Sequence, residues 1–176
     1  MRKMAAPLGL IVVYSILIMV SVPAGHVFGS HIDWLCQHIV LAETIRDACL
    51  AQHTLLPDWL ELGGGSNGYQ FAYYGFLRPD ILLGCLLPQI SMSVLVIGYM
   101  LVVGLVSALL LYAWLFLECG RRDIAWMAAV LFITAGCMFH LHRQIMFVNY
   151  FPFLLLTLLC IKRGKTHWVP LCLLGV

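Results

Sequence analysis

Apolar residues are concentrated in long runs along this 176-residue chain, and one long polar segment separates the first run from the others. The runs cover about residues 7–24, 90–117, 124–139 and 145–161, and another starts at Trp168. A helix that spans a bilayer needs about 20 mostly apolar residues, with a range of about 17–25. The pattern therefore predicts four transmembrane helices and the beginning of a fifth.

The apolar stretch Ile81–Leu87 precedes the second span and is separated from it by Pro88. Because proline interrupts a helix, this stretch is expected to form a short interfacial or re-entrant piece.

The polar segment, about residues 25–80, holds six of the eight acidic residues: Asp33, Glu43, Asp47, Asp58, Glu61 and Asp80. Within it, Ile32–Gln52 shows apolar residues at helical spacing with a broad apolar stripe. We expect an amphipathic helix at the membrane surface, with Trp34 and Ile45 toward the membrane or the protein. Leu62–Gly68 is rich in glycine and predicts irregular structure.

Composition supports the same class. Hydrophobic residues make up 62% and charged residues 10%, and the mean hydropathy is +0.97. Soluble domains carry about 25% charged residues. The fold class expected is all-α: a polytopic helical membrane protein with an amphipathic helix in a large first outer loop. No nucleic-acid partner is expected.

The basic residues predict the orientation. Seven of the ten lie before the first span, in the 119–123 turn or in the 162–167 turn, and the other three lie in alternate segments. Cytoplasmic loops carry an excess of Lys and Arg. The N-terminus is therefore expected in the cytoplasm and the 25–80 loop outside. The last apolar run stops at Val176 after about nine residues, so we expect the chain to be the N-terminal part of one longer transmembrane domain.

Asp33 follows the first span and is the first candidate for chemistry. A carboxylate at the bilayer surface can act as a general base or bind a metal for a lipid-borne substrate. The alternative is that it stabilises the N-terminus of the surface helix through the helix dipole.

Arg46 has carboxylates nearby at Glu43 and Asp47, so it can form local ion pairs or meet a lipid phosphate. Arg78 flanks Pro79 where the loop returns to the bilayer, and an interfacial anchor is the favoured interpretation.

The cysteines give no redox motif. There is no Cys-x-x-Cys, and Cys36 and Cys49 would be about 20 Å apart on one continuous helix. The remaining cysteines lie in or beside spans, and we expect them to pack as small apolar side chains.

Several motifs together resemble the N-terminus of the bacterial YfhO-like membrane proteins. They are Asp33-Trp34, Gln37-His38, Arg46-Asp47, Gly63-Gly64-Gly65, Asn67, Tyr69, Phe71, Tyr73-Tyr74-Gly75, Pro79 and the run Asn149–Leu154. The resemblance covers essentially the whole chain. One departure is Arg78-Pro79, where many relatives have Ser-Pro.

That family is grouped with GT-C type glycosyltransferases, which use polyprenyl-phosphate-linked sugars. The resemblance implies an essential acid in the first outer loop, which Asp33 matches, and an association with glycosylation of cell-surface polymers such as lipoteichoic acid.

The function expected is transfer of a sugar from a polyprenyl-phosphate carrier to a cell-surface acceptor on the outer face of a bacterial cell membrane. Asp33 is the expected catalytic residue and the expected ligand if a divalent metal ion takes part. The expected substrate-binding residues are Gln37, His38, Glu43, Arg46, Asp47, Asn67, Tyr73 and Tyr74. The alternatives are a flippase-like transporter of lipid or polysaccharide and a non-catalytic assembly subunit.

Overall fold

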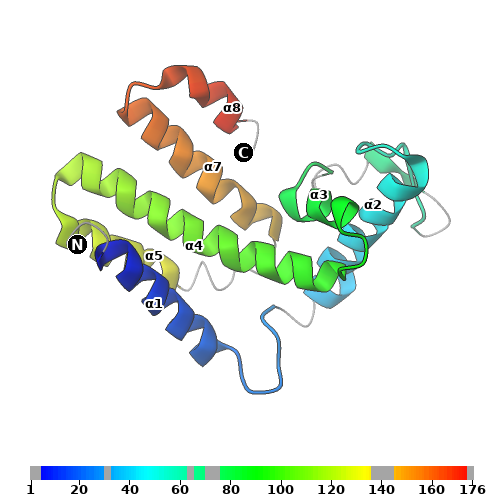
Figure 1. The fold of residues 1–176 in the computed structure, drawn as a ribbon, viewed down its shortest axis with the longest axis horizontal. Coiled ribbons are helices and arrows are strands. Elements are labelled where there is room, and N and C mark those ends of the chain that lie inside the picture. The colour runs from blue at the N-terminus through cyan, green and yellow to red at the C-terminus, as the bar shows by residue number, and fades with distance from the viewer. Residues whose placement is uncertain (1–4, 30–32, 63–65, 70–75, 136–144, 174–176) are drawn as a thin grey trace. The chain divides into compact units, whose positions relative to one another are not determined.

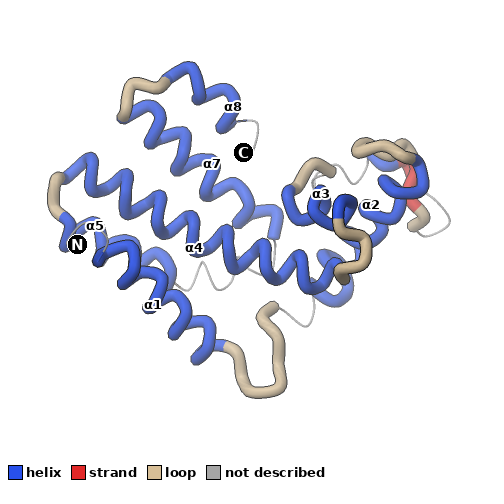
Figure 2. The backbone as a smooth tube through the Cα atoms, in the orientation of Figure 1, coloured by secondary structure: helices blue, strands red, loops and turns tan. Residues whose placement is uncertain are grey.

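The chain is mostly helical, which confirms the all-α prediction. The computed structural model describes residues 5–29, 33–62, 66–69, 76–135 and 145–173 (Figure 1). Its longer helices are α1 (Ala5–Ser21), α2 (Ile39–Gln52), α3 (Pro79–Leu86), α4 (Met92–Cys119), α5 (Arg122–Thr134) and α7 (Ile145–Lys162). The shorter elements are the π-helical turn η1 (Trp34–His38), the strands β1 (Trp59–Leu60) and β2 (Ser66–Asn67), the 3₁₀ turn η3 (Thr166–Trp168) and helix α8 (Val169–Leu173), most of them visible in Figure 2.

The chain divides into two compact units. One, the apolar unit, contains residues 1–28, 101–142 and 147–176, and the other, the loop unit, contains residues 29–100 and 143–146. Helix α4 contributes its first turns to the loop unit and its remainder to the apolar unit.

Two glycines allow helices to pack closely in the apolar unit. A Cβ atom on Gly9 of α1 would lie 3.3 Å from the Trp126 indole nitrogen of α5. A Cβ atom on Gly104 of α4 would lie 2.5 Å from the Tyr14 hydroxyl of α1. At both positions the missing side chain leaves room for an aromatic ring from a neighbouring helix.

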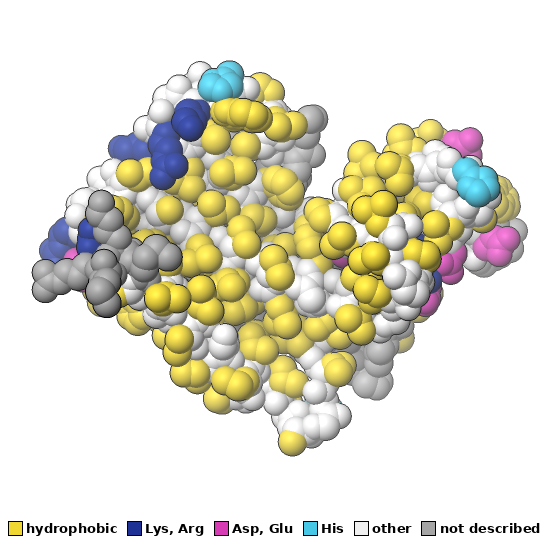
Figure 3. Space-filling view, viewed as in Figure 1, with side chains coloured by type: hydrophobic (Ala, Val, Ile, Leu, Met, Phe, Trp, Pro, Cys, Tyr) yellow, Lys and Arg dark blue, Asp and Glu magenta, His cyan; other side chains and the backbone are white. Residues whose placement is uncertain are grey.

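The helices of this unit alternate in direction. Lys162 Nζ, at the end of α7, donates to Glu118 Oε2, near the end of α4, at 2.9 Å. Gly9 and Trp126 lie near the starts of α1 and α5. Helix α5 begins at Arg122, directly after α4 ends at Cys119, so the ends of α4 and α7 lie beside the starts of α1 and α5. Among the described residues of this unit, the Lys and Arg side chains gather at that end (Figure 3).

In the loop unit, α2 packs against α3. Gly84 of α3 faces Arg46 of α2, and a Cβ atom there would lie 3.2 Å from the Arg46 Cδ. Trp34 and Ile45 are buried, at 2% and 0% exposure. The predicted helix is thus confirmed over residues 33–52, with both side chains facing the protein interior, and its position at a membrane surface stays a prediction.

Ser66–Asn67 corrects the expectation that Leu62–Gly68 lacks regular structure. These residues pair antiparallel with β1, Trp59 opposite Asn67 and Leu60 opposite Ser66. The Gly68 amide continues the pairing by donating to the Asp58 carbonyl at 2.8 Å. A Cβ atom on Gly68 would collide with the Pro57 carbonyl oxygen, so glycine permits the pairing rather than preventing it.

Two predicted spans are shorter than expected. Helix α1 ends at Ser21 rather than Ala24 because Pro23 disfavours helical backbone at the residue before it. Helix α5 ends at Thr134 rather than Phe139, since Ala135 is extended, with φ −63° and ψ 133°.

Only α4 is long and apolar enough, by length and composition, to cross a membrane within the described part of the chain. The apolar helices at Ala5–Ser21 and Val148–Lys162 are shorter. The sequence also predicted a short segment at Ile81–Leu87, separated by Pro88 from the second span. Helix α3 agrees with this prediction, because it ends at Leu86, before Pro88.

Candidate functional site

Asp33 lies at the start of the π-helical turn η1 and is half-buried. Its carboxylate makes no capping hydrogen bond to that turn. The alternative role, an interaction with the helix dipole, stays a prediction. π-helical turns are rare and are found frequently at functional sites. The Asp33 carboxylate therefore lies at this turn without a capping hydrogen bond to it.

The adjacent Trp34 anchors this turn. Its indole is buried and packs against Gly29, where a Cβ atom would lie 3.1 Å from the ring. Gly29 has a φ of +139°, which a side chain would strain. A larger residue at Gly29 would thus strain the backbone and press on the Trp34 ring. Asp33 is the sequence neighbour of this buried tryptophan.

Gln37 and His38 complete the turn but differ in exposure. Gln37 is exposed, whereas His38 is 1% exposed and meets Trp34 edge-on, with the ring centroids 6.5 Å apart. Gln37 can therefore meet a solute from solvent, while His38 forms part of the interior. The predicted pair of sugar ligands is not presented on one surface.

Arg46 is the centre of a charged cluster on α2. Its Nε donates to Asp47 Oδ1 at 2.9 Å, its Nη2 to Glu43 Oε1 at 3.5 Å, and its Nη1 to the Ile90 carbonyl at 3.3 Å. The Arg46 side chain is 10% exposed, against 50% for Glu43 and 60% for Asp47. All three guanidinium nitrogens are thus engaged by the protein.

This cluster presents carboxylates to solvent and keeps its guanidinium inside. Arg46 holds the two acids and ties α2 to the turn before α4 through Ile90. Carboxylate oxygens accept hydrogen bonds from hydroxyl groups such as those of a sugar. These bonds use three of the five guanidinium N–H donors of Arg46, and its contact with a lipid phosphate stays a prediction.

A second ion pair, Arg78–Asp80, lies in the interior of the loop unit. Arg78 Nε donates to Asp80 Oδ1 at 2.6 Å and Nη2 donates to Oδ2 at 2.8 Å. Arg78 is 5% exposed and Asp80 0% exposed. The interpretation of Arg78 as an interfacial anchor is therefore wrong, because an anchor must keep its guanidinium at the headgroups.

The signal for this pair was present in the sequence. Pro79 occupies the first helical position of α3, and Asp80 lies in the first turn, where the helix dipole favours an anion. Arg78 precedes the helix with an extended backbone, which directs its side chain back toward the carboxylate. The short Arg-Pro-Asp motif is thus a self-contained, two-bond ion pair.

Asn67 has a local partner. Its side-chain oxygen accepts a hydrogen bond from the Tyr69 amide at 2.9 Å, which closes a turn after β2. Tyr73 and Tyr74, the remaining predicted substrate-binding residues, lie outside the described residues.

No group of three or more His, Cys, Asp or Glu side chains that could hold a metal ion occurs among the described residues. Asp33 as a metal ligand stays a prediction.

No family model, curated protein or solved structure matches this chain.

Proposed function

We propose that the chain belongs to a membrane glycosyltransferase that moves a sugar from a polyprenyl-phosphate carrier to a cell-surface acceptor on the outer face. The observation that carries this proposal is the uncapped, half-buried carboxylate of Asp33 at a π-helical turn. The same helical segment continues into α2, which presents the exposed acids Glu43 and Asp47.

In the proposed reaction, the Asp33 carboxylate accepts the proton of an acceptor hydroxyl. The acceptor oxygen forms a bond to the anomeric carbon of the sugar as the bond from that carbon to the phosphate oxygen breaks. The electron pair leaves with the polyprenyl phosphate. Glu43 and Asp47 accept hydrogen bonds from hydroxyl groups of the sugar or acceptor, and Arg46 positions both carboxylates.

A multi-pass arrangement with a cytoplasmic N-terminus is part of this proposal. Helix α4 has the length and apolar composition of a span. The Glu118–Lys162 bridge, the Gly9–Trp126 contact and the short turn from Cys119 to Arg122 bring the starts of α1 and α5 beside the ends of α4 and α7. Alternating spans require this arrangement, and the basic residues that favour the cytoplasm occur at that shared end.

The buried Arg78–Asp80 pair favours a second candidate, a flippase-like transporter of lipid or polysaccharide. Buried ion pairs within or beside membrane segments often mark translocation pathways. Asp80 and Arg78 are within electrostatic range of Tyr99 on α4. The two candidates differ in product: a transferase makes a new glycosidic bond, and a transporter moves its substrate unchanged.

The test is Asp33→Asn in the full-length protein in membranes, with radiolabelled sugar transfer from a polyprenyl-phosphate donor as the readout. This change keeps the shape and removes the base, so transfer is expected to fall about 100-fold or more. Asp58→Asn is the matched control: it is an exposed acid of the same loop unit and should leave transfer unchanged.

Near-normal transfer by a well-expressed Asp33→Asn protein would remove Asp33 from the chemistry. Absence of transfer in the unmodified protein, combined with movement of labelled lipid across vesicles, would support the transporter instead.

A further inference from the structure

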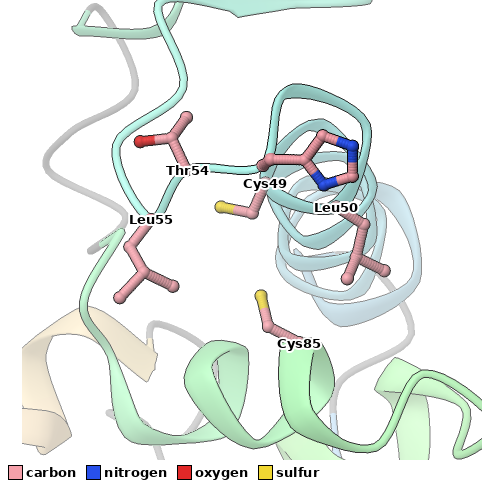
Figure 4. A pocket seen from close by; sticks show the side chains of 6 residues that line it. Cys49, Leu50, Thr54, Leu55 and Cys85 are labelled. Carbon is pink, nitrogen blue, oxygen red and sulfur yellow. The ribbon is translucent and has the colours of Figure 1, made fainter.

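Two cysteines from different helices meet in the loop unit. Cys49 lies near the end of α2 and Cys85 near the end of α3. Both line one surface pocket of about 210 Å³, together with Leu50, His53, Thr54 and Leu55. Figure 4 shows Cys49 and Cys85 on facing sides of this pocket, with the Cys85 sulfur pointing toward Cys49. The two thiols interact electrostatically, and both are free.

The backbone holds Cys49 in place. Its carbonyl oxygen accepts hydrogen bonds from the His53 amide, which caps α2, and from the Thr54 amide at 3.1 Å. His53 has a φ of +52°, the left-handed conformation that ends many helices. Because α2 ends there, the chain turns away and leaves the pocket open beside the Cys49 sulfur.

The side of the pocket that carries Cys85 is also held in place by packing. Gly84, the neighbour of Cys85, packs against Arg46 and Met92 without space for a side chain. The same contact that holds α3 against α2 therefore keeps Cys85 opposite Cys49. The two thiols face each other because the helices are packed, not because their positions in the sequence are close.

We propose that Cys49 and Cys85 form a dithiol site that exchanges with an external disulfide and closes into a Cys49–Cys85 crosslink between α2 and α3. Cys85 is half-buried and Cys49 is 4% exposed, so Cys85 is the thiol that an incoming reagent meets first. The co-reactant is a small or protein-borne disulfide with access to the pocket.

The exchange is balanced in two steps. Cys85 loses its proton and attacks one sulfur of the external disulfide, which forms a mixed disulfide and releases one thiol. Cys49 then loses its proton and attacks the Cys85 sulfur, which closes the crosslink and releases the second thiol. The protein dithiol is oxidised by two electrons, and the external disulfide is reduced to two thiols. His53, on the pocket wall, supplies an imidazole that can accept a proton.

A crosslink here would fasten α2, which carries Glu43, Arg46 and Asp47, to α3. The site does not depend on the proposed transferase activity. Its oxidation in cells, however, rests on the outer placement of the loop unit, because disulfides persist in oxidising compartments.

The experiment uses two-cysteine proteins in which the other cysteines are replaced by alanine. One keeps Cys49 and Cys85. A control keeps Cys36 and Cys49, which lie 13 residues apart along one helical path, or about 20 Å at 1.5 Å per residue. A second control keeps Cys160 and Cys172, whose thiols also interact and which lie in the apolar unit. Each folded protein is treated with oxidised glutathione in detergent, quenched with acid and denatured, and its remaining thiols are tagged with a heavy maleimide.

On oxidation, the Cys49/Cys85 protein should lose both tags at least tenfold faster than the Cys36/Cys49 control. After reduction it should regain both tags. Cys49→Ala in the Cys49/Cys85 background should retain a stable mixed disulfide with glutathione at Cys85, detected by mass. Persistence of both tags, or closure no faster than in the Cys36/Cys49 control, would overturn the proposal.

Repeating the experiment in intact cells tests the location of the loop unit separately from the ability of the two thiols to form a crosslink. Oxidation of Cys49/Cys85 with Cys160/Cys172 still reduced supports both the dithiol and the outer loop unit. Closure in detergent with both pairs reduced in cells supports the dithiol and contradicts the orientation on which the proposed function rests.

Discussion

The guanidinium of Arg78 and the carboxylate of Asp80 form a two-bond ion pair in the interior of the loop unit, with N–O distances of 2.6 and 2.8 Å. Asp80 has no exposed surface. Such a pair contributes little net stability relative to apolar side chains, but removing one partner leaves an uncompensated buried charge. The pair is therefore sensitive to substitution in a way that an exposed pair is not.

Asp80→Asn is expected to destabilise the fold by about 3–5 kcal/mol, because Arg78 would remain buried with a neutral partner. Thermal unfolding in detergent measures the loss. Asp123→Asn is the matched control, since the Arg121–Asp123 pair has the same spacing but side chains 64% and 58% exposed. The control should unfold at nearly the normal temperature, and equal losses in the two variants would contradict the buried-pair explanation.

Gly68→Ala is expected to disrupt the β1–β2 pairing. A methyl group would collide with the Pro57 carbonyl, which is backbone and cannot move aside without displacing the strand. We expect a loss of about 1–3 kcal/mol, the range of ordinary damaging substitutions, measured by chemical unfolding.

Gly98→Ala on α4 is the control for the Gly68 substitution, since a Cβ atom at Gly98 meets nothing within 4 Å. Alanine favours helix there, so stability should be unchanged or slightly higher. A Gly68→Ala protein as stable as the Gly98→Ala protein would show that the close approach at Pro57 is unimportant.

Cys49 should react slowly with iodoacetamide near neutral pH. Burial, with a smaller contribution from Cys85, raises the pKa of the Cys49 thiol from its usual 9.0 to about 11. At pH 8 this lowers the thiolate fraction about 100-fold, and the thiolate is the reactive form. Peptide-resolved mass spectrometry of the reduced protein should show a rate that rises until about pH 11, and a plateau near pH 9 would contradict this.

The same shift predicts a pH dependence of stability. Below about pH 9 the thiol is protonated in both folded and unfolded chains, so its contribution is fully present. Between about pH 9 and 11 the unfolded chain loses this proton first, because the folded pKa is the higher one. Stability should therefore fall as pH rises through this window, and a Cys49→Ala protein should lose that part of the decrease.

The proposed orientation predicts which introduced cysteines a membrane-impermeant maleimide can reach. In a background without native cysteines, Glu61→Cys should react in intact cells, whereas Lys165→Cys should react only after the membrane is opened. Both native residues are exposed, so accessibility within the protein does not limit either reaction. The reverse pattern would place the loop unit in the cytoplasm.

Much of the fold could be predicted from the sequence because it depends on local periodicity and local breakers. The apolar runs and Pro88 were sufficient to place α3, α4 and α7 and the helix that contains α2. The apolar stripe of that helix also indicated that Trp34 and Ile45 would be covered. Such properties depend on residues within a few turns of one another.

Tertiary structure decided which polar groups are available for chemistry. Only packing shows that His38 and Arg78 are buried and that Ile90 engages Arg46, since these depend on residues distant in the sequence. The Cys49–Cys85 site has the same origin, because its two thiols are brought together by the packing of Gly84 against Arg46. Hydrophobic periodicity determines that a helix forms and which stripe is apolar, and close neighbours in the sequence supply partners such as Asp80 for Arg78. Whether such a pair is buried, and which distant residue also contacts it, is set by long-range contacts, which no local pattern encodes.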